Sequence, residues 1–364
     1  MDRRDFLKAG LTAPVVYAGF PGLARAATAG EAWRVFEVTT RINVADVAGA
    51  TRVWLPLPLT RDTDYFKALG STWSADGGAV RMVVDEKYRA GMVSAEFPDG
   101  AAAAALTVVS RFATRDRAVS LATPPAQPVE EERAVLRQSL EATELLPTDG
   151  IVRATARDII RGQRNDIDRA RAVYEWIVNN TFRDAKVRGC GWGDVKAMLE
   201  TGNFGGKCGD LNAMFVALCR SVGIPARDIY GIRVAKSRLG YASLGANTEN
   251  ISRAQHCRAE FYAKGYGWIP VDPADVRKVV LEEPPGNLPL SDAKVKAARE
   301  RLFGAWEMNW LAYNYAHDVQ LPGSSGPRIP YLMYPNGETA KGRLDSLEPD
   351  QFKYAITARE IALT

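Results

Sequence analysis

Residues 205–227 read GGKCGDLNAMFVALCRSVGIPAR and place a cysteine between a glycine turn and an apolar helix. The apolar residues after Cys208 follow the i, i+3, i+4, i+7, i+11 spacing of one helical face: Leu211, Met214, Phe215, Leu218 and Val222. Gly223, with Ile224-Pro225 behind it, is a helix stop signal. The pattern predicts a buried central helix that begins at the Gly205-Gly206 turn, with Cys208 in its first turn.

The position of Cys208 favours a reactive thiol. Unpaired backbone N–H groups and the positive end of a helix dipole stabilise a thiolate, which lowers the pKa of a cysteine there. The adjacent glycines let a substrate backbone approach closely. The alternative is a small buried hydrophobe, which is our interpretation of Cys219, nearly on the same helical face.

A cysteine nucleophile needs a base, most often histidine, and the chain has two, His256 and His317. His256 opens QHCRAEFYAKGYGWIPVDPAD, residues 255–275, which we predict to be a β-hairpin. With a three-residue loop centred on Lys264, His256 lies opposite Asp272, where Cβ atoms are about 5 Å apart. Asp272 would then orient the imidazole and stabilise its charged form.

Each of these residues also has a purely structural interpretation. A one-residue slip would put His256 and Asp272 on opposite faces of the hairpin. His256 alone is compatible with a strand-end histidine bonded to the backbone, and Asp272 with an Asp-Pro turn. The triad logic favours Cys208, His256 and Asp272 as catalytic residues. No acidic residue lies across a readable hairpin from His317, which we interpret as structural or supporting.

The periodicity divides the chain into regions. Residues 31–120 alternate short β-type runs with turn signals, which predicts an N-terminal antiparallel β domain, and LATPPAQP at 121–128 reads as a linker. From residue 130 the period becomes 3.6, and we expect helices at 130–146, 149–162 and 165–180, the last with Asp166 as N-cap. Strand-like segments follow the cysteine helix. We therefore predict an α+β fold, with a core at 130–280 and C-terminal strands at 281–364 that extend the core sheet.

Five motifs in this order resemble the core domain of the transglutaminase-like superfamily, whose fold is related to papain-like cysteine proteases: GGKCGD, FVALCRSVGIPAR, IYGIRV, QHCRAEFY and WIPVDPAD. The resemblance covers about residues 150–280 and implies a buried central helix packed on an antiparallel sheet. It implies that Cys208 is the nucleophile, His256 the base and Asp272 the residue that orients the base. The flanking β regions resemble those of exported bacterial members.

The resemblance also bears on the oxyanion donors and on cofactors. It implies that the backbone N–H of Cys208 is one donor to an oxyanion, with a side chain as the second. Trp192, Asn203 and Gln255 remain open for that second role. Animal members bind calcium through acidic clusters that have no recognisable counterpart here, so we expect no cofactor.

The N-terminus is typical of a secretory signal. Arg3-Arg4, a short apolar run and Ala24-Arg25-Ala26 predict a twin-arginine signal peptide at residues 1–26, and hence Tat export to the periplasm or secretion. No later apolar run reaches the about 20 residues of a membrane span. Removing residues 1–26 takes away four basic and two acidic residues, so the net charge falls from +4 to +2. This balance argues against nucleic acid as the main partner.

The four cysteines do not form a disulfide scaffold pattern. Cys190, Cys208, Cys219 and Cys257 are too few and too scattered, and the absence of a Cys-x-x-Cys pair argues against zinc. If Cys208 is a free thiol, the other three can form at most one intramolecular disulfide.

Together these features predict an exported cysteine-dependent acyl-transfer enzyme, a thiol peptidase or amidase whose partner is a peptide or protein amide. Water as the acyl acceptor gives hydrolysis, and an amine gives a crosslinking transglutaminase. We favour hydrolysis because water is abundant outside the cytoplasm. A non-catalytic binding or scaffold protein that keeps the fold is the alternative from another class. Transfer from a coenzyme A thioester fits an exported protein poorly, because that donor is cytoplasmic.

Overall fold

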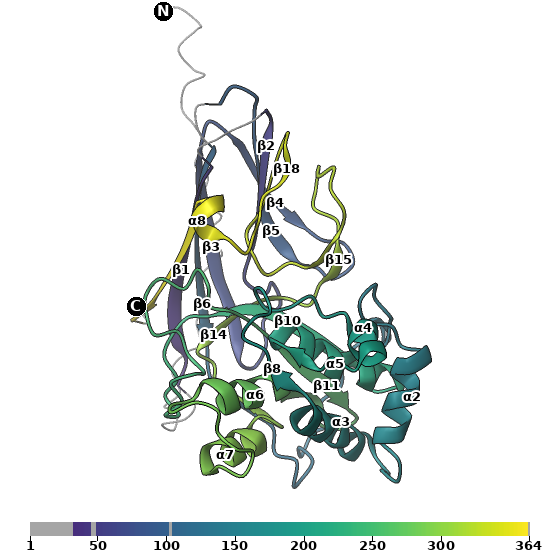
Figure 1. Cartoon of the computed structure of the whole chain (residues 1–364). Helices are drawn as coiled ribbons and strands as arrows, with labels where there is room; N and C mark the ends of the chain where they lie inside the picture. The colour runs from purple at the N-terminus through teal and green to yellow at the C-terminus, as the bar shows by residue number, and fades with distance from the viewer. Residues whose placement is uncertain (1–31, 45–48, 102–103, 363–364) are drawn as a thin grey trace, which may run out of the picture.

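The computed structural model describes residues 32–44, 49–101 and 104–362 (Figure 1). The expected signal peptide at 1–26 lies outside these residues. Two β-sheets form the upper part of the molecule in Figure 1, and a mixed helix and sheet core forms the lower part. The predicted α+β fold is confirmed.

The upper part is a β-sandwich. One sheet has the order β19-β1-β6-β3, with the bounds Tyr354–Ile361, Arg34–Val44, Ala104–Thr114 and Phe66–Asp76. The other has the order β18-β17-β2-β5-β4, with the bounds Gly342–Arg343, Asn336–Thr339, Thr51–Pro56, Gly91–Phe97 and Ala79–Val84. Side chains along β6 alternate between more and less buried, as expected of a strand with one face on a core. Phe36, Val53, Val93 and Leu106 bring both sheets into one hydrophobic cluster.

The lower part is built on an antiparallel sheet of order β12-β11-β10-β14, with the bounds Gly267–Val271, Gln255–Ala263, Ala226–Arg233 and Trp310–Asn314. Helix α5, Cys208–Ser221, packs against β10 and β11, and all of its residues are buried. From the same sheet, Ile229, Ile232 and Trp310 join the hydrophobic cluster of the sandwich. The sheet therefore lies between its central helix and the β-sandwich.

Seven further helices lie outside α5 in the described part of the chain (Figure 1). These are α1 (Arg133–Gln138), α2 (Gly150–Ile159), α3 (Asp166–Asn180), α4 (Val195–Thr201), α6 (Pro273–Glu282) and α7 (Ala293–Arg301), with the short α8 (Pro349–Phe352) beside the sandwich. Of these, α2, α3, α4 and α6 pack against α5, and α7 packs on α6. Three two-stranded pairs complete the fold: β7 (Arg117–Ala118) with β13 (Ala305–Trp306), β8 (Phe182–Arg183) with β9 (Gly205–Gly206), and β15 (His317–Val319) with β16 (Ile329–Tyr331).

Several expected elements differ from those observed. Only α1 forms within residues 130–146, and the N-cap of α3 is Asn165, whose side chain accepts from the N–H of Asp168, rather than Asp166. Of the C-terminal strands, β14 joins the core sheet, whereas β17 pairs with β2 and β19 with β1. The expectation that residues 281–364 extend the core sheet is thus wrong for most of that segment, because those strands complete the sandwich. Among the described residues, no helix has the length and apolarity needed to cross a membrane.

Candidate active site

The first turn of α5 is fixed by a tight local arrangement. The carboxylate of Asp210 accepts from the backbone N–H of Lys207 and of Gly193, each at 2.9 Å. The N–H of Gly209 donates to the carbonyl of Cys190 at 2.7 Å. A Cβ at Gly206 would lie 2.6 Å from the Asp210 Cβ, so glycine is required there. Cys208 is the first helical residue, as predicted, and the loop at 190–193 is held against it.

The hairpin carries His256 and Asp272 to each other in a register that differs from the expected one. Ala263 pairs with Gly267, so the loop is centred on Gly265 rather than Lys264, and the register is displaced by two residues. A shift by an even number keeps both side chains on one face. His256 Nε2 and Asp272 Oδ2 are therefore still in contact, at 2.7 Å, although the two residues are not directly opposite.

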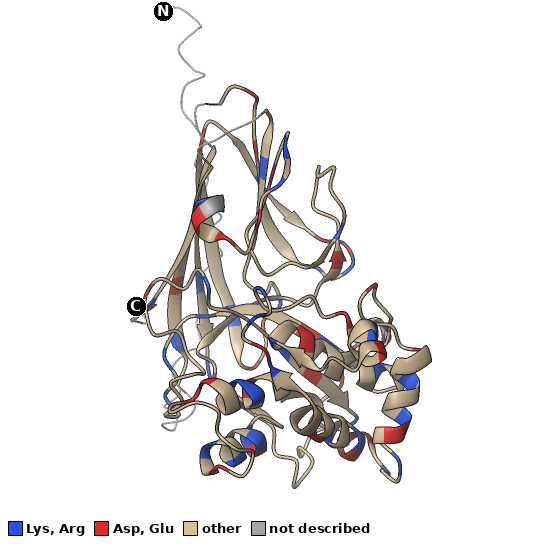
Figure 2. Ribbon diagram, viewed as in Figure 1, with Lys and Arg blue, Asp and Glu red and all other residues tan. Residues whose placement is uncertain are grey.

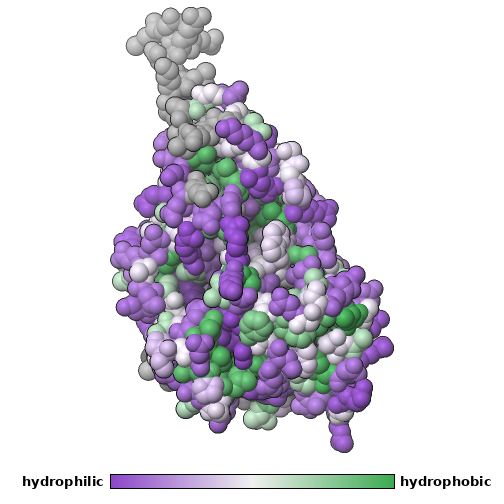
Figure 3. Space-filling model, in the orientation of Figure 1, coloured by the Kyte–Doolittle hydropathy of each residue, from purple (hydrophilic) through white to green (hydrophobic). Residues whose placement is uncertain are grey.

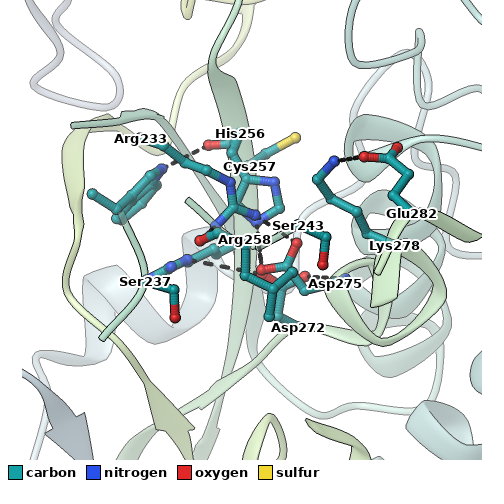
Figure 4. A network of polar contacts seen from close by, with 12 residues as sticks. Arg233, Ser237, Ser243, His256, Cys257, Arg258, Asp272, Asp275, Lys278 and Glu282 are labelled. Atoms are coloured by element: carbon teal, nitrogen blue, oxygen red, sulfur yellow. Dashed lines mark hydrogen bonds and ion pairs between the residues drawn. The ribbon is translucent and has the colours of Figure 1, made fainter. Parts of the chain in front are cut away.

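Asp272 is held from several directions (Figure 4). It is the N-cap of α6, and its Oδ1 accepts from the backbone N–H of Asp275 at 3.0 Å. The Asn212 amide, from the second turn of α5, donates to Asp272 Oδ1 at 3.2 Å and to the Cys257 carbonyl at 2.8 Å. Asn212 thus links the helix of Cys208 to the carboxylate that contacts His256.

Opposing charges surround the imidazole. Asp275 Oδ2 lies 3.4 Å from His256 Nε2, and Arg233 pairs with Asp275 at 2.6 Å. Burial and the Arg233 charge lower the pKa of His256, but Asp275 and Asp272 outweigh them and raise it to about 10. Because Asp272 engages Nε2, the second ring nitrogen is the one available to exchange a proton with Cys208. The imidazole is accordingly held in its charged form.

Three of the four cysteines meet at this point. The Sγ atoms of Cys190, Cys208 and Cys257 lie within 4.8 Å of one another, and none forms a disulfide. Hydrogen bonds from Cys190 and Cys257 outweigh burial and, with His256, hold the pKa of Cys208 well below its usual range. The pKa of Cys190 and of Cys257 is raised well above that range, for Cys190 first by the Cys208 hydrogen bond and for Cys257 first by burial. Of the three thiols, the one whose pKa is lowered is therefore Cys208, at the start of α5.

Two groups have the spacing of metal ligands. They are the three thiols just described and the set His256, Asp272 and Asp275. In the first group the Cys190 thiol donates to the carbonyl of Gln255 at 3.4 Å. In the second, His256 contacts Asp272 at 2.7 Å and lies 3.4 Å from Asp275. We assign neither group to a metal.

A cavity of about 420 Å³ opens beside Cys208 and His256, both of which line it. The face of the molecule in Figure 3 is hollowed near its middle, and many of the side chains around the hollow are hydrophilic. Of the three residues considered as a second oxyanion donor, Gln255 lines the cavity, whereas Trp192 and Asn203 do not. Trp192 is 69% exposed. Gln255 is therefore the one of the three that lies at the cavity of Cys208.

His317 lies in a separate buried cluster. Its Nε2 is 3.3 Å from Asp228 Oδ2, and its Nδ1 is 3.5 Å from the hydroxyl of Tyr230. It therefore has an acidic partner, which comes from β10 of the core sheet. Sequence analysis missed this partner because it considered only residues opposite each other in one hairpin. Because His317 does not line the cavity of Cys208, it remains outside the candidate site.

Comparisons with known proteins agree with this geometry. The model of the transglutaminase-like superfamily matches residues 153–273. An uncharacterized protein of Haemophilus influenzae is 36% identical over 330 residues, which cover 86% of this chain and 87% of that protein. The crystal structure of a proposed cysteine protease from Cytophaga hutchinsonii has a TM-score of 0.50 at 15% identity and matches over 90% of this chain and 98% of its own, which supports the fold alone. The chain belongs to the transglutaminase-like superfamily.

Proposed function

We propose that this protein is a cysteine-dependent hydrolase of peptide-like amides with Cys208, His256 and Asp272 as its catalytic residues. One observation carries the proposal: a cysteine of lowered pKa at a helix start lines the same cavity as a histidine that is bonded to a buried carboxylate at 2.7 Å. Nucleophilic catalysis needs this arrangement of nucleophile, base and orienting acid.

The chemistry proceeds in two halves. The Cys208 thiolate attacks the amide carbonyl carbon, and the tetrahedral intermediate collapses to a thioester as His256 gives its proton to the departing amine nitrogen. Water then attacks the thioester while His256 takes a proton from it, and the carboxylic acid leaves with regeneration of the thiolate. Asp272 stabilises the imidazolium, which is present before the amine leaves and forms again as water attacks.

The oxyanion in both halves needs donors aimed at it. Among the described residues, the backbone N–H of Cys208 donates to no other group, whereas that of Gly209 is engaged by Cys190. We propose this free N–H as the first donor and the Gln255 amide as the second. That amide donates to the Ser252 carbonyl at 3.2 Å, so it would exchange this bond for the oxyanion.

The test measures amide hydrolysis by the mature chain on a peptide library, beside Cys208→Ala and His256→Ala. We expect released amine with the wild type and at least a thousandfold less with either variant. The same assay with a glutamine-containing peptide and a labelled amine shows whether water or an amine is the acyl acceptor. Formation of crosslinked product would contradict the hydrolase proposal and identify the enzyme as a transglutaminase. A cellular phenotype that survives Cys208→Ala would instead indicate a binding protein.

The cellular location of the protein is also part of the proposal. We propose the periplasm or the extracellular space, on the basis of the twin-arginine pattern at residues 1–26. Fractionation of cells that express the full chain, compared with Arg3→Lys/Arg4→Lys, tests it. The protein should move from the exported to the cytoplasmic fraction in the variant.

A further inference from the structure

The cavity beside Cys208 is lined by basic side chains and by no acidic one in the part of the chain that the structure describes. Its basic residues are Arg183, Lys207, Arg233, Arg253 and Lys278. The whole chain, in contrast, has 47 basic and 43 acidic residues, so the two signs are nearly balanced overall. Lys278 lies on α6, where Figure 2 shows basic segments. Positive charge therefore predominates among the side chains that line this cavity.

Three of these positive charges have only one carboxylate between them. Arg183 and Lys278 both pair with a single carboxylate, that of Glu282 (the Lys278 pair is drawn in Figure 4). Lys207, directly before the nucleophile, forms no ion pair with any carboxylate among the described residues. An anion that enters the cavity would therefore meet positive charge that the protein itself does not neutralise.

Arg233 and Arg253, in contrast, each pair with a carboxylate that does not line the cavity. Arg233 pairs with Asp275 at 2.6 Å, and Arg253 with Asp350 at 3.2 Å. These two residues therefore contribute less to the excess, which lies with Lys207 and with the Arg183, Lys278 and Glu282 group.

Partial burial strengthens the effect of this excess charge. The side chains of Arg183 and Lys278 are 13% and 17% exposed. Burial and, after it, the charge of the neighbouring Arg183 lower the pKa of Lys278 against the pull of Glu282. Solvent screens such groups less than it screens exposed ones. The start of α5 adds the positive end of its dipole on the same side.

From these contacts we infer that the acyl donor is an acidic peptide, in which a carboxylate lies close to the amide presented to Cys208. This inference rests on the proposed function. The carboxylate is bound by Lys207 and by the Arg183 and Lys278 pair, and the amide is thereby aligned with the nucleophile. A neutral peptide of the same shape would lack this anchor.

The test uses two alkylating agents that differ in charge. Iodoacetate is anionic and iodoacetamide is neutral. Both reagents alkylate a reactive cysteine, so the test does not require that the substrate be known. We expect the ratio of the rate constants for iodoacetate and iodoacetamide at Cys208 to exceed the ratio for free cysteine by about tenfold at low salt. It should fall toward the free-cysteine ratio as salt is added, because added ions screen the attraction.

Variants localise the effect. Lys207→Gln and Lys278→Gln should each lower the ratio several-fold without abolishing reaction with iodoacetamide. Lys264→Gln, in the loop at the far end of β11, is the matched control and should leave the ratio unchanged. With a turnover assay in hand, the first two variants should raise KM for a glutamate peptide but not for its glutamine isostere.

The possible outcomes separate the two proposals. Rapid reaction of Cys208 with both reagents and no preference for iodoacetate overturns the acidic-peptide inference and leaves the hydrolase proposal standing. A preference that persists in Lys207→Gln and Lys278→Gln also overturns it, since the named residues would not be its source. If Cys208 reacts with both reagents no faster than Cys190 does, Cys208 is not an activated nucleophile, and both proposals fail together.

Discussion

Asp272 contacts the imidazole of His256 and the N-terminus of α6 with different oxygen atoms. Asp272→Asn keeps an acceptor for the helix cap but removes the charge that stabilises the imidazolium. We expect amide hydrolysis to fall by about two to four orders of magnitude, with a small change in the free energy of unfolding. Kinetics and urea denaturation of the same preparation measure both. Asp292→Asn, which changes the N-cap of α7 away from the site, is the control, and wild-type turnover in Asp272→Asn would contradict the assigned role.

Gln255 permits a sharper test of the oxyanion site. Gln255→Leu removes the side-chain donor while keeping similar volume, so kcat should fall by about 10²–10³ with KM nearly unchanged. Trp192→Leu, at an exposed position outside the cavity, should leave both constants unchanged. An effect at Trp192 and none at Gln255 would reverse the assignment of the second donor.

At the scale of residues, the sequence predicts side chains whose role follows from local position. Cys208 is recognisable because a helix start has its own electrostatics, and His256 because histidines are rare in this chain. Asn212, Asp275 and Cys190 have no such signal. They reach the site through helix and loop packing, and only the spacing of four between Cys208 and Asn212, which places both on one helical face, could have suggested one of them.

Helix α5 carries Cys208, and its buried apolar face holds that residue in place. Leu218 is fully buried in the cluster around α5. Leu218→Ala should lower the free energy of unfolding by about 2–5 kcal/mol, because a cavity remains where the side chain was. Leu239→Ala, at a residue that is 39% exposed, should cost less than about 1 kcal/mol. Equal losses in urea denaturation would contradict the view of α5 as the central core element.

Helices and turns that are determined by residues close in sequence are predicted better than strands whose position depends on their pairing partners. The start of α5 and its stop before Gly223 follow from apolar spacing and glycine chemistry. The predicted hairpin loop is centred one residue early, on Lys264, because the sequence AKGYG at residues 263–267 offers more than one three-residue loop. The prediction that His256 and Asp272 share one face of the hairpin still holds, because a displacement of the loop centre by one residue shifts the pairing by two.

Over the whole molecule, acid should weaken the sandwich through Glu338 on β17. Burial raises the pKa of Glu338, but hydrogen bonds from Ser324 and Ser325 and the charge of Arg343 outweigh it and lower the pKa to about 2. The folded pKa lies below the ordinary value of 4.5, so the carboxylate stabilises the fold above pH 4.5, and this stabilisation is lost as the pH falls toward 2.

Glu338→Gln tests this linkage. It should cost about 1–3 kcal/mol at pH 7 in urea denaturation, and its difference from the wild type should shrink steadily below pH 4.5. A difference that does not change between pH 7 and pH 3 would show that the ionised carboxylate is not the stabilising group.

The assembly of the two parts was the least predictable feature. Apolar alternation predicts strands at both ends of the chain but does not say which sheet they join. β19 pairs with β1 across more than three hundred residues, and such pairings are decided by the shape of the complete core. The sandwich is consequently closed by the C-terminal strands, while only β14 reaches the sheet that carries His256.

The central claim is an ion pair between Cys208 and His256, and the pH dependence of alkylation tests it most directly. The rate of iodoacetamide labelling at Cys208 is measured by mass spectrometry from pH 5 to pH 10, beside Cys190, Cys219 and Cys257, in the wild type and in His256→Ala. We predict rapid labelling of Cys208 well below the about 8.5 pKa of an ordinary thiol, with a marked loss in the variant. Labelling of Cys208 that rises only near pH 8.5, at the rate of the other cysteines and without any effect of His256, would contradict the account.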